Sequence, residues 1–318
     1  MSLIRLSPAM RKTCTDALLP PHAGEGLRLT QLSTGDGGKP FLSLSLRVLR
    51  LNRIAPGGIS SDAPASCSDV VSSCEAAVLA RKRYNTVPMI TLLHHAFCPH
   101  SRYIRLALGE YGLECELMEE RVWERDEEFL ALNPAGTTPV MMLDGEPPIP
   151  GADVIAEYLD ETHGLERTSR RLMPATATER AEVRRLVSWF NDKFYNEVSG
   201  PLVTERVYKR FMSAEQGGGA PSTDVMRAAR ANLRYHLAYI GWLARTRNFL
   251  AGDRLTYADL AAAAHLSAID YLGDVPWNED EAAKAWYVRI KSRPSFRPLL
   301  NEWLAGLPAP AHYIDLDF

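Results

Sequence analysis

An ordered alternation of apolar and polar positions begins at Met89. Residues 89–94 form a short apolar run, which predicts a strand. The apolar spacing from Tyr103 to Tyr111 then predicts a helix that ends at Gly112, because glycine readily adopts the left-handed conformation of a helix C-cap. The chain therefore enters its folded part as a strand followed by a helix.

The same pattern continues through a complete α/β unit. It predicts a second strand over 115–119, a helix over 124–132, a third strand over 139–143, a turn at Asp144-Gly145, a short fourth strand ending at Pro150, and a helix over 153–161. The order βαβαββα is that of a thioredoxin-like domain. We therefore expect such a domain over residues 89–164 and a linker over 165–175.

The remainder of the chain is predicted to be helical. Long amphipathic patterns cover 179–211 and 224–247, and a helix over 258–271 is apolar on nearly all sides, which indicates that it is buried. Thr256 precedes Asp259 by three residues and so forms a capping box at the start of that helix. We expect an all-helical domain over residues 176–303 and an extended tail over 304–318.

Residues 1–88 lack this periodicity and are rich in Ser, Pro, Gly and Arg. Such a composition rarely buries enough apolar surface to offset chain entropy, so one interpretation is a disordered extension. A second is that translation starts at Met89. A targeting segment is the third, although no clean apolar stretch with a cleavage site follows the first residues.

Charge and cysteine content narrow the classes of function. Residues 1–88 carry five more basic than acidic side chains, whereas residues 89–318 carry eight more acidic than basic ones. An acidic body without a basic stripe argues against nucleic acid as a partner. The five cysteines are odd in number and lack metal-ligand spacing, so we predict no metal site and a reducing, cytoplasmic setting. No apolar run is long enough for a membrane span.

Four segments together resemble the glutathione S-transferase superfamily. They are Phe97-Cys-Pro-His-Ser-Arg102, Asn133-Pro-Ala-Gly-Thr-Thr-Pro-Val140, Ile155-Ala-Glu-Tyr-Leu159 and Phe249-Leu-Ala-Gly-Asp-Arg-Leu-Thr-Tyr-Ala-Asp259. Their order and spacing match the family throughout residues 89–318. The resemblance implies a thioredoxin-like N-terminal domain, a helical C-terminal domain and a homodimer.

The resemblance also implies where glutathione chemistry would take place. Cys98 and Ser101 occupy the region from which family members stabilise or bond the glutathione sulfur, aided by the N-terminus of the following helix. The alternative is that they are a small buried side chain and a helix-capping serine. Pro139 matches the cis-proline of the family, and Thr138 before it would present backbone groups to glutathione.

The sequence departs from the family where the γ-glutamyl end of glutathione is held. Family members usually have Glu or Gln followed by Ser there, and this chain has Gly151 and Ala152. Neither side chain can hydrogen-bond, and Asp153 would repel a carboxylate. Losing two charge-assisted hydrogen bonds of roughly 1.5–3 kcal/mol each weakens binding by orders of magnitude. We expect a degraded glutathione site and no required cofactor.

Longer blocks resemble the GST-like cell-division proteins of alphaproteobacteria, which bind the tubulin homologue FtsZ. The blocks are Arg121–Arg125, Val207–Ser213 with Gln216–Gly219, Tyr235–Trp242, Asp270–Trp277 and His312–Phe318. The resemblance implies FtsZ as a partner and a location at the division site. The expected partner contacts are Trp123 and, in the tail, Tyr313, Asp315, Leu316, Asp317 and Phe318. The tail has an alternative, which is to pack on its own domain.

Two functions remain open from the sequence. The first is a division regulator that binds FtsZ filaments and promotes constriction. The second is a glutathione-dependent transferase or thiol reductase that uses Cys98 or Ser101.

Overall fold

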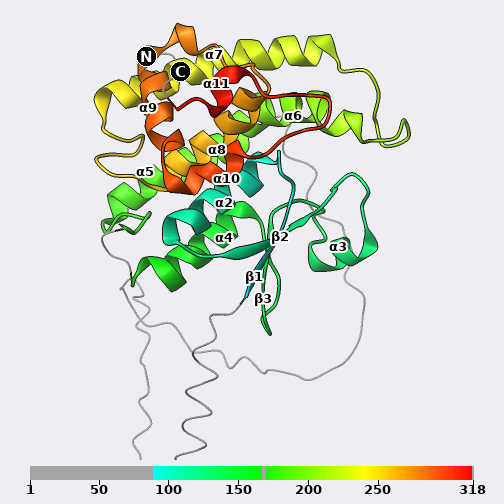
Figure 1. Ribbon diagram of the computed structural model, residues 1–318. Coiled ribbons are helices and arrows are strands. Elements are labelled where there is room, and N and C mark those ends of the chain that lie inside the picture. Colours follow the sequence, from blue (N-terminus) through cyan, green and yellow to red (C-terminus); the bar gives the residue numbers. More distant parts are fainter. Residues whose placement is uncertain (1–88, 167–169, 317–318) are drawn as a thin grey trace, which may run out of the picture. The chain divides into compact units, whose positions relative to one another are not determined.

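The computed structural model describes residues 89–166 and 170–316, so the three interpretations of residues 1–88 concern a segment outside the described range. Within that range the chain starts with strands and helices in the predicted order and then continues with helices (Figure 1). The fold is a thioredoxin-like unit followed by a helical domain, as predicted.

A sheet of four strands forms the first domain. The strands are β1 (Ile90–His94), β2 (Cys115–Glu119), β3 (Val140–Leu143) and β4 (Ile149–Pro150). Their order is β2-β1-β3-β4, with β1 parallel to β2 and antiparallel to β3, and β3 antiparallel to β4. Helix α2 (Pro99–Tyr111) makes the crossover between the two parallel strands, and it ends at Gly112, whose φ of 63° is left-handed as predicted.

Helices cover both faces of this sheet. Leu92 and Leu93 are neighbours in β1 and so point to opposite faces. Leu92 belongs to the large core that includes α2 and α4 (Ala152–Leu159), whereas Leu93 belongs to a small core with Phe129 of α3 (Glu127–Leu132). The short π-helical segment η2 (Asp160–Gly164) extends α4.

Helix α3 begins three residues later than the predicted 124. Arg125 has a left-handed φ of 52°, which interrupts a helix at that point. Asp126 then caps α3, because its carboxylate accepts hydrogen bonds from the amides of Glu128 and Phe129 at 2.9 and 3.1 Å.

The second domain packs its helices around α8 (Tyr257–Tyr271), whose residues are all buried. The other helices are α5 (Ala177–Ser188), α6 (Gly200–Arg206), α7 (Thr223–Thr246), α9 (Glu281–Lys291), α10 (Arg297–Leu300) and α11 (Ala311–Ile314), with short 3₁₀ turns at Tyr208–Arg210 (η5), Trp277–Glu279 (η6) and Pro294–Phe296 (η7). Helix α8 also packs against α2 (Figure 1). One continuous apolar core therefore includes residues of both domains.

The prediction of a long helix over 179–211 holds from 179 to 206, but this helix is not α-helical throughout. The helix changes from α5 to a π-helical segment, η4 (Trp189–Ser199), and returns to α-helix at α6. Pro201 stands at the start of α6 and has no amide hydrogen, so the regular hydrogen-bond ladder cannot run through this point. Apolar spacing predicted a helix here but not the i→i+5 hydrogen bonding of its middle part.

The capping box of α8 is confirmed. One oxygen of Asp259 accepts from the amide and the hydroxyl of Thr256, each at 3.0 Å. The other oxygen accepts from the amide of Leu250 at 2.8 Å and from the indole of Trp286 at 3.0 Å. The Asp259 side chain therefore also connects the preceding loop and α9 to the start of α8.

The tail is not extended throughout. It contains α11, and the Tyr313 side chain is 0% exposed, with its hydroxyl donating to the carbonyl of Leu299 at 3.0 Å. The ammonium of Lys291 donates to the carbonyls of His312 and Asp315 at 2.8 and 2.7 Å. As far as residue 316, the structure matches the alternative in which the tail packs on its own domain.

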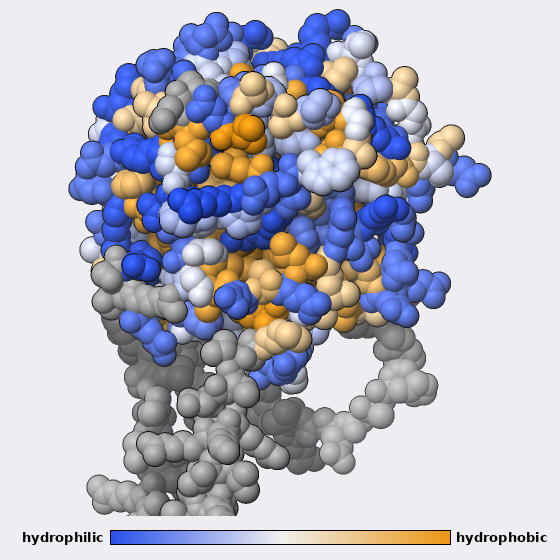
Figure 2. Space-filling model, in the orientation of Figure 1, coloured by the Kyte–Doolittle hydropathy of each residue, from blue (hydrophilic) through white to orange (hydrophobic). Residues whose placement is uncertain are grey.

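The visible surface in Figure 2 is mostly polar, with apolar areas over the sheet and over the helical domain. On edge strand β2, Leu117 and Met118 are exposed. No helix in the described residues combines the length and the apolar character needed to cross a membrane.

Candidate functional site

A cavity of about 280 Å³ opens where the two domains meet, at the N-terminal ends of α2 and α4. We call it the Cys98 cavity. The first domain contributes Cys98, His100, Val122, Gly136, Thr137, Thr138, Gly151, Ala152 and Asp153, and the second contributes Asn191, Asp192, Tyr195 and Tyr208.

Cys98 is the N-cap residue of α2 and is almost fully buried. Its thiol lies 3.6 Å from the carbonyl oxygen of Thr138, to which it donates. Burial alone would raise the pKa of this thiol, but hydrogen bonding to His100 and the charge of that imidazole lower the pKa to about 7, with smaller contributions from Ser101 and Thr138. A substantial fraction of Cys98 is therefore thiolate near neutral pH.

His100 interacts with Cys98, and the sequence alone gave it no role. Burial would lower its pKa, but the hydrogen bond and charge of Cys98 outweigh burial and raise the pKa above its ordinary value. Its Nε2 atom lies 3.0 Å from the carbonyl oxygen of Asn191, so it donates there when protonated. Each group thus favours the charged form of the other near neutral pH.

Asn191 connects this pair to a buried polar network. Its amide donates to the Asp153 carboxylate at 2.6 Å, and its side-chain oxygen lies 3.2 Å from Nε2 of His265. The other ring nitrogen of His265 lies 2.7 Å from the hydroxyl of Ser199. Burial lowers the pKa of His265 well below its usual value, so that ring is neutral and holds the Asn191 side chain in place.

Two tyrosines from the helical domain also line the cavity. Burial, followed by the nearby Cys98 charge, raises the pKa of Tyr195 to about 12 and that of Tyr208 well above its usual value. Both phenols therefore remain neutral and can donate. Tyr208 lies in the block Val207–Ser213, but neither tyrosine was assigned a role from the sequence, because both lie about a hundred residues from Cys98 and reach the cavity only through the domain packing.

Ser101 and Thr138 support Cys98. The Ser101 side chain is 0% exposed, and its hydroxyl accepts from the amide of His95 at 3.4 Å. The peptide bond between Thr138 and Pro139 is cis, as the family resemblance implied. The carbonyl of Pro139 accepts from the amide of Gly151 at 3.0 Å, which ties β3 to the start of α4.

The α4 side of the cavity offers no polar side chain at Gly151 or Ala152. Gly151 is the N-cap residue of α4 with a left-handed φ of 93°, and no side chain caps this end of the helix. Asp153 is the next polar residue, and burial raises the pKa of its carboxyl group. Cys98 and Thr138 both line the cavity, whereas Gly151 and Ala152 bring no side-chain donor or acceptor to it.

Within the described ranges, no group of three or more His, Cys, Asp or Glu residues is arranged to hold a metal ion.

The predicted partner contacts lie in two places. Trp123 is half-buried between His95, Tyr208 and Phe211, with ring centroids at 5.5, 5.1 and 6.4 Å, and its indole nitrogen is buried with no acceptor among the described residues. In the tail, Tyr313 lies in the core, Asp315 is exposed and Leu316 is half-buried, whereas Asp317 and Phe318 fall outside the described residues.

Comparisons with known proteins agree with this architecture. The model of the glutathione S-transferase N-terminal domain matches residues 92–167, and that of the C-terminal domain matches residues 177–294. FtsZ-localized protein A of Caulobacter vibrioides is 47% identical over 231 residues, which span 72% of this chain and 98% of that protein.

Solved structures show the same likeness. A glutathione S-transferase from Sinorhizobium meliloti shares 51% identity at a TM-score of 0.71, and FzlA from C. crescentus shares 46% identity at a TM-score of 0.66. Each comparison covers 72% of this chain and 100% of the other. With both domain models matched in order and a relative covered almost end to end, the chain belongs to the glutathione S-transferase family.

Proposed function

We propose that this protein is a GST-fold regulator of cell division that binds FtsZ filaments at the division site and promotes constriction. The observation that carries the proposal is the 47% identity to FtsZ-localized protein A, which extends over 98% of that protein. A match of 231 residues is too long for either domain alone.

The geometry of the Cys98 cavity supports a role other than glutathione transfer. Gly151 and Ala152 supply no side-chain donor or acceptor at the start of α4, and Asp153 is engaged by Asn191 at 2.6 Å. A ligand with a free carboxylate meets a negative group there instead of a hydrogen-bond donor. Glutathione is therefore expected to bind weakly, and no cofactor is required.

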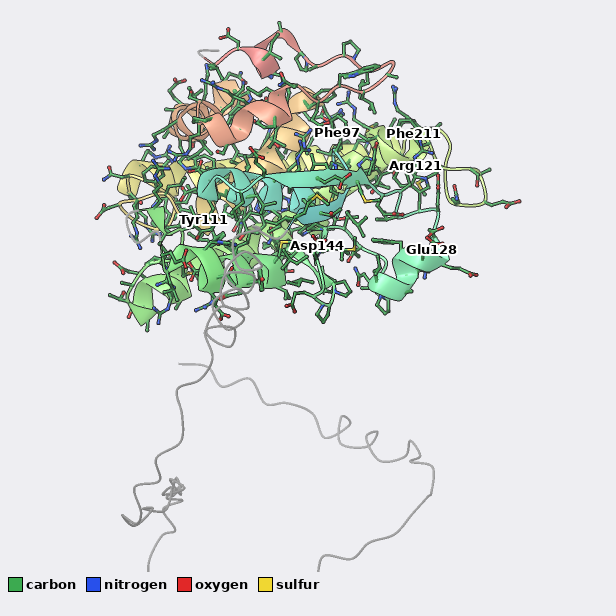
Figure 3. The ribbon with its side chains drawn as sticks, turned by 60° about the horizontal axis from the view of Figure 1, so that its bottom comes forward. Phe97, Tyr111, Arg121, Glu128, Asp144 and Phe211 are labelled. Atoms are coloured by element: carbon green, nitrogen blue, oxygen red, sulfur yellow. The ribbon has the colours of Figure 1, made fainter. Side chains whose placement is uncertain are left out.

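A surface suited to a protein partner lies beside this cavity. Phe211 is 44% exposed and stacks on Trp123, and the guanidinium of Arg121 lies 6.0 Å from the Phe211 ring centroid (Figure 3). We call Arg121, Trp123 and Phe211 the Trp123 face. Aromatic and arginine side chains supply most of the binding energy in many protein interfaces.

Co-sedimentation with polymerised FtsZ tests the proposal. We expect the wild-type chain to pellet with filaments, and Trp123→Ala or Phe211→Ala to weaken binding at least about tenfold. Trp242→Ala, at an exposed tryptophan on α7, is the matched control. If wild-type protein stays in the supernatant at every FtsZ concentration, the proposed function fails.

The tail requires its own variants, because part of it is structural. A chain that ends at Leu316 lacks Asp317 and Phe318 but keeps the Lys291 contacts. If the last two residues contact the partner, this chain binds filaments less well while retaining its thermal stability. Unchanged filament binding would remove these two residues from the partner surface.

We also propose that the protein acts as a homodimer, as the family resemblance implies. Two copies of the Trp123 face would raise the effective concentration of the second contact on a filament. Light scattering at working concentrations tests this, and a monomeric mass would count against it.

A thiol-dependent activity is the second candidate, and the Cys98–His100 pair favours it. A thiol with a pKa of about 7 is a reactive nucleophile near neutral pH. This candidate predicts calorimetric binding of glutathione in the millimolar range or tighter, and turnover that Cys98→Ala abolishes. If titration with glutathione gives no heat of binding, this second candidate is excluded and only the division role remains.

A further inference from the structure

A second cavity, of about 210 Å³, lies between α2, α4, α5 and α8 and is separate from the Cys98 thiol. We call it the Tyr103 cavity. Its floor is made of the buried residues Tyr103, Ala156, Met173, Val187 and Tyr257, and its rim of Asp153, Glu157, Arg184 and Ser188. An apolar floor with a polar rim is the usual form of a small-molecule site.

The floor contains one hydrogen-bond donor without a partner. The Tyr103 side chain is 0% exposed, and none of the described residues accepts a hydrogen bond from its hydroxyl. The neighbouring phenols of Tyr111 and Tyr257 are bonded to each other at 3.2 Å. A buried hydroxyl without an acceptor is destabilising, so this one requires an acceptor from outside the chain.

The charges around the cavity define which acceptor is suitable. Arg184, the one cation among the described lining residues, is neutralised by a two-point ion pair with Glu157 at 2.8 and 3.1 Å. The Asp153 carboxyl group accepts from Asn191 at 2.6 Å, so the described lining offers no free positive charge. Burial first, and then the charges of Asp153 and Glu157, raise the pKa of Tyr103 well above its usual value, so the phenol stays protonated. An anionic ligand would be repelled, whereas a neutral acceptor would not.

We propose that the Tyr103 cavity binds a small neutral molecule with a flat ring and a carbonyl oxygen that accepts a hydrogen bond from Tyr103. A dry protein cavity of roughly 150 Å³ is sufficient for benzene, so this cavity has room for a ring with one polar substituent. The carbonyl points to Tyr103 at the floor, the apolar floor residues pack against the ring, and the ring edge opposite the carbonyl faces the rim.

Such a ligand would contact both domains at once. Tyr103 and Ala156 belong to the thioredoxin-like domain, whereas Val187 and Tyr257 belong to the helical domain. Binding would therefore stabilise the packing of the two domains without contact to Cys98 or to the Trp123 face.

Benzamide and benzoate form a matched pair of probes, because they share a shape and differ in charge. With the full chain, titration calorimetry or ligand-detected NMR is expected to show benzamide binding in the millimolar range or tighter and benzoate binding at least several-fold weaker. Tyr103→Phe should weaken benzamide about 3- to 10-fold, the range of one neutral hydrogen bond.

Two cavity-filling variants and one control separate this site from others. Ala156→Met and Val187→Met each place a longer side chain in the cavity and are expected to abolish benzamide binding. Their folding is checked by thermal unfolding, and two independent positions guard against one variant that misfolds. Cys98→Ala lies in the other cavity and should leave benzamide binding unchanged.

The proposal is overturned if benzamide shows no binding at millimolar concentration, or if both filling variants bind it like the wild type. It is also overturned if Cys98→Ala abolishes binding, which would place the probe in the Cys98 cavity. A crystal structure in benzamide that shows only a water molecule on the Tyr103 hydroxyl would likewise exclude it.

Discussion

Cys98 and His100 lie two residues apart on the first turn of α2, and each favours the charged form of the other against the effect of burial. The carbonyl of Asn191, from the other domain, orients the imidazole at 3.0 Å. The reactivity of the thiol thus depends on the contact with the second domain as well as on the segment Phe97–Arg102.

The rate of alkylation of Cys98 by iodoacetamide is expected to rise as pH increases through about 7, because the thiolate is the nucleophile and its pKa is lowered to that value. In His100→Leu, burial is no longer opposed by the imidazole, so the midpoint should move to pH 9 or higher. At pH 7 the thiolate fraction then falls from about a half to about one in a hundred, a loss of roughly 50-fold.

Mass spectrometry of the peptide that contains Cys98 measures this rate separately from the other cysteines. His100→Gln is the informative comparison, since it keeps a hydrogen-bond donor without the charge and should give an intermediate midpoint. A wild-type midpoint near 9 would show that the imidazole does not stabilise the thiolate.

The sequence predicted one side of the Cys98 cavity but not the other. Cys98, Thr138 and Pro139 stand in recognisable motifs, and the structure places Cys98 and Thr138 together in the cavity lining, with Pro139 following Thr138. Asn191 and Tyr195 lie in no motif, because their role arises from domain packing over about a hundred residues of chain. Periodicity reports which face of a helix is buried and not which distant residue it meets.

At the level of secondary structure, α8 depends most on its first turn. The Asp259 carboxylate accepts four hydrogen bonds, from the amide and hydroxyl of Thr256, the amide of Leu250 and the indole of Trp286. One side chain therefore joins the start of α8, the loop before it and α9.

Asp259→Ala is expected to lower the free energy of unfolding by roughly 3 kcal/mol or more, since it leaves three buried N–H donors without an acceptor at about 1–3 kcal/mol each. Thr256→Ala removes only the capping hydroxyl and should cost about 1 kcal/mol. Urea unfolding followed by circular dichroism measures both. Equal losses in the two variants would contradict the view that Asp259 joins three elements.

The elements themselves were predictable to different degrees. Strand β2 has the predicted bounds and Gly112 ends α2 as predicted, because a strand edge and a left-handed glycine are local features. The π-helical segment η4 was not predicted, since no residue type in it signals i→i+5 hydrogen bonding. The start of α3 was misplaced because the left-handed Arg125 is not a residue type that signals a break.

At the scale of the whole molecule, the buried side chain of Arg102 connects the C-terminal tail to the residues just before Cys98. Arg102 donates to the carbonyl of Ala96 at 2.7 Å, to the hydroxyl of Ser267 at 2.9 Å and to the hydroxyl of Tyr313 at 3.2 Å. Ala96 lies two residues before Cys98. The docked tail is therefore part of the structure that holds the N-terminal end of α2.

Lys291→Met is expected to release the tail, because the methionine cannot donate to the carbonyls of His312 and Asp315. Hydrogen bonds from a charged donor contribute roughly 1.5–3 kcal/mol, so the opening of residues 311–316 should become at least about tenfold more frequent. Hydrogen–deuterium exchange of the C-terminal peptide measures this.

Arg289→Met is the control on the same helix, since that guanidinium lies over the ring of Phe249, at 4.9 Å, and not on the tail. If Lys291→Met leaves exchange of residues 311–316 as slow as in the wild type, Tyr313 alone anchors the tail, and Tyr313→Ala should then release it.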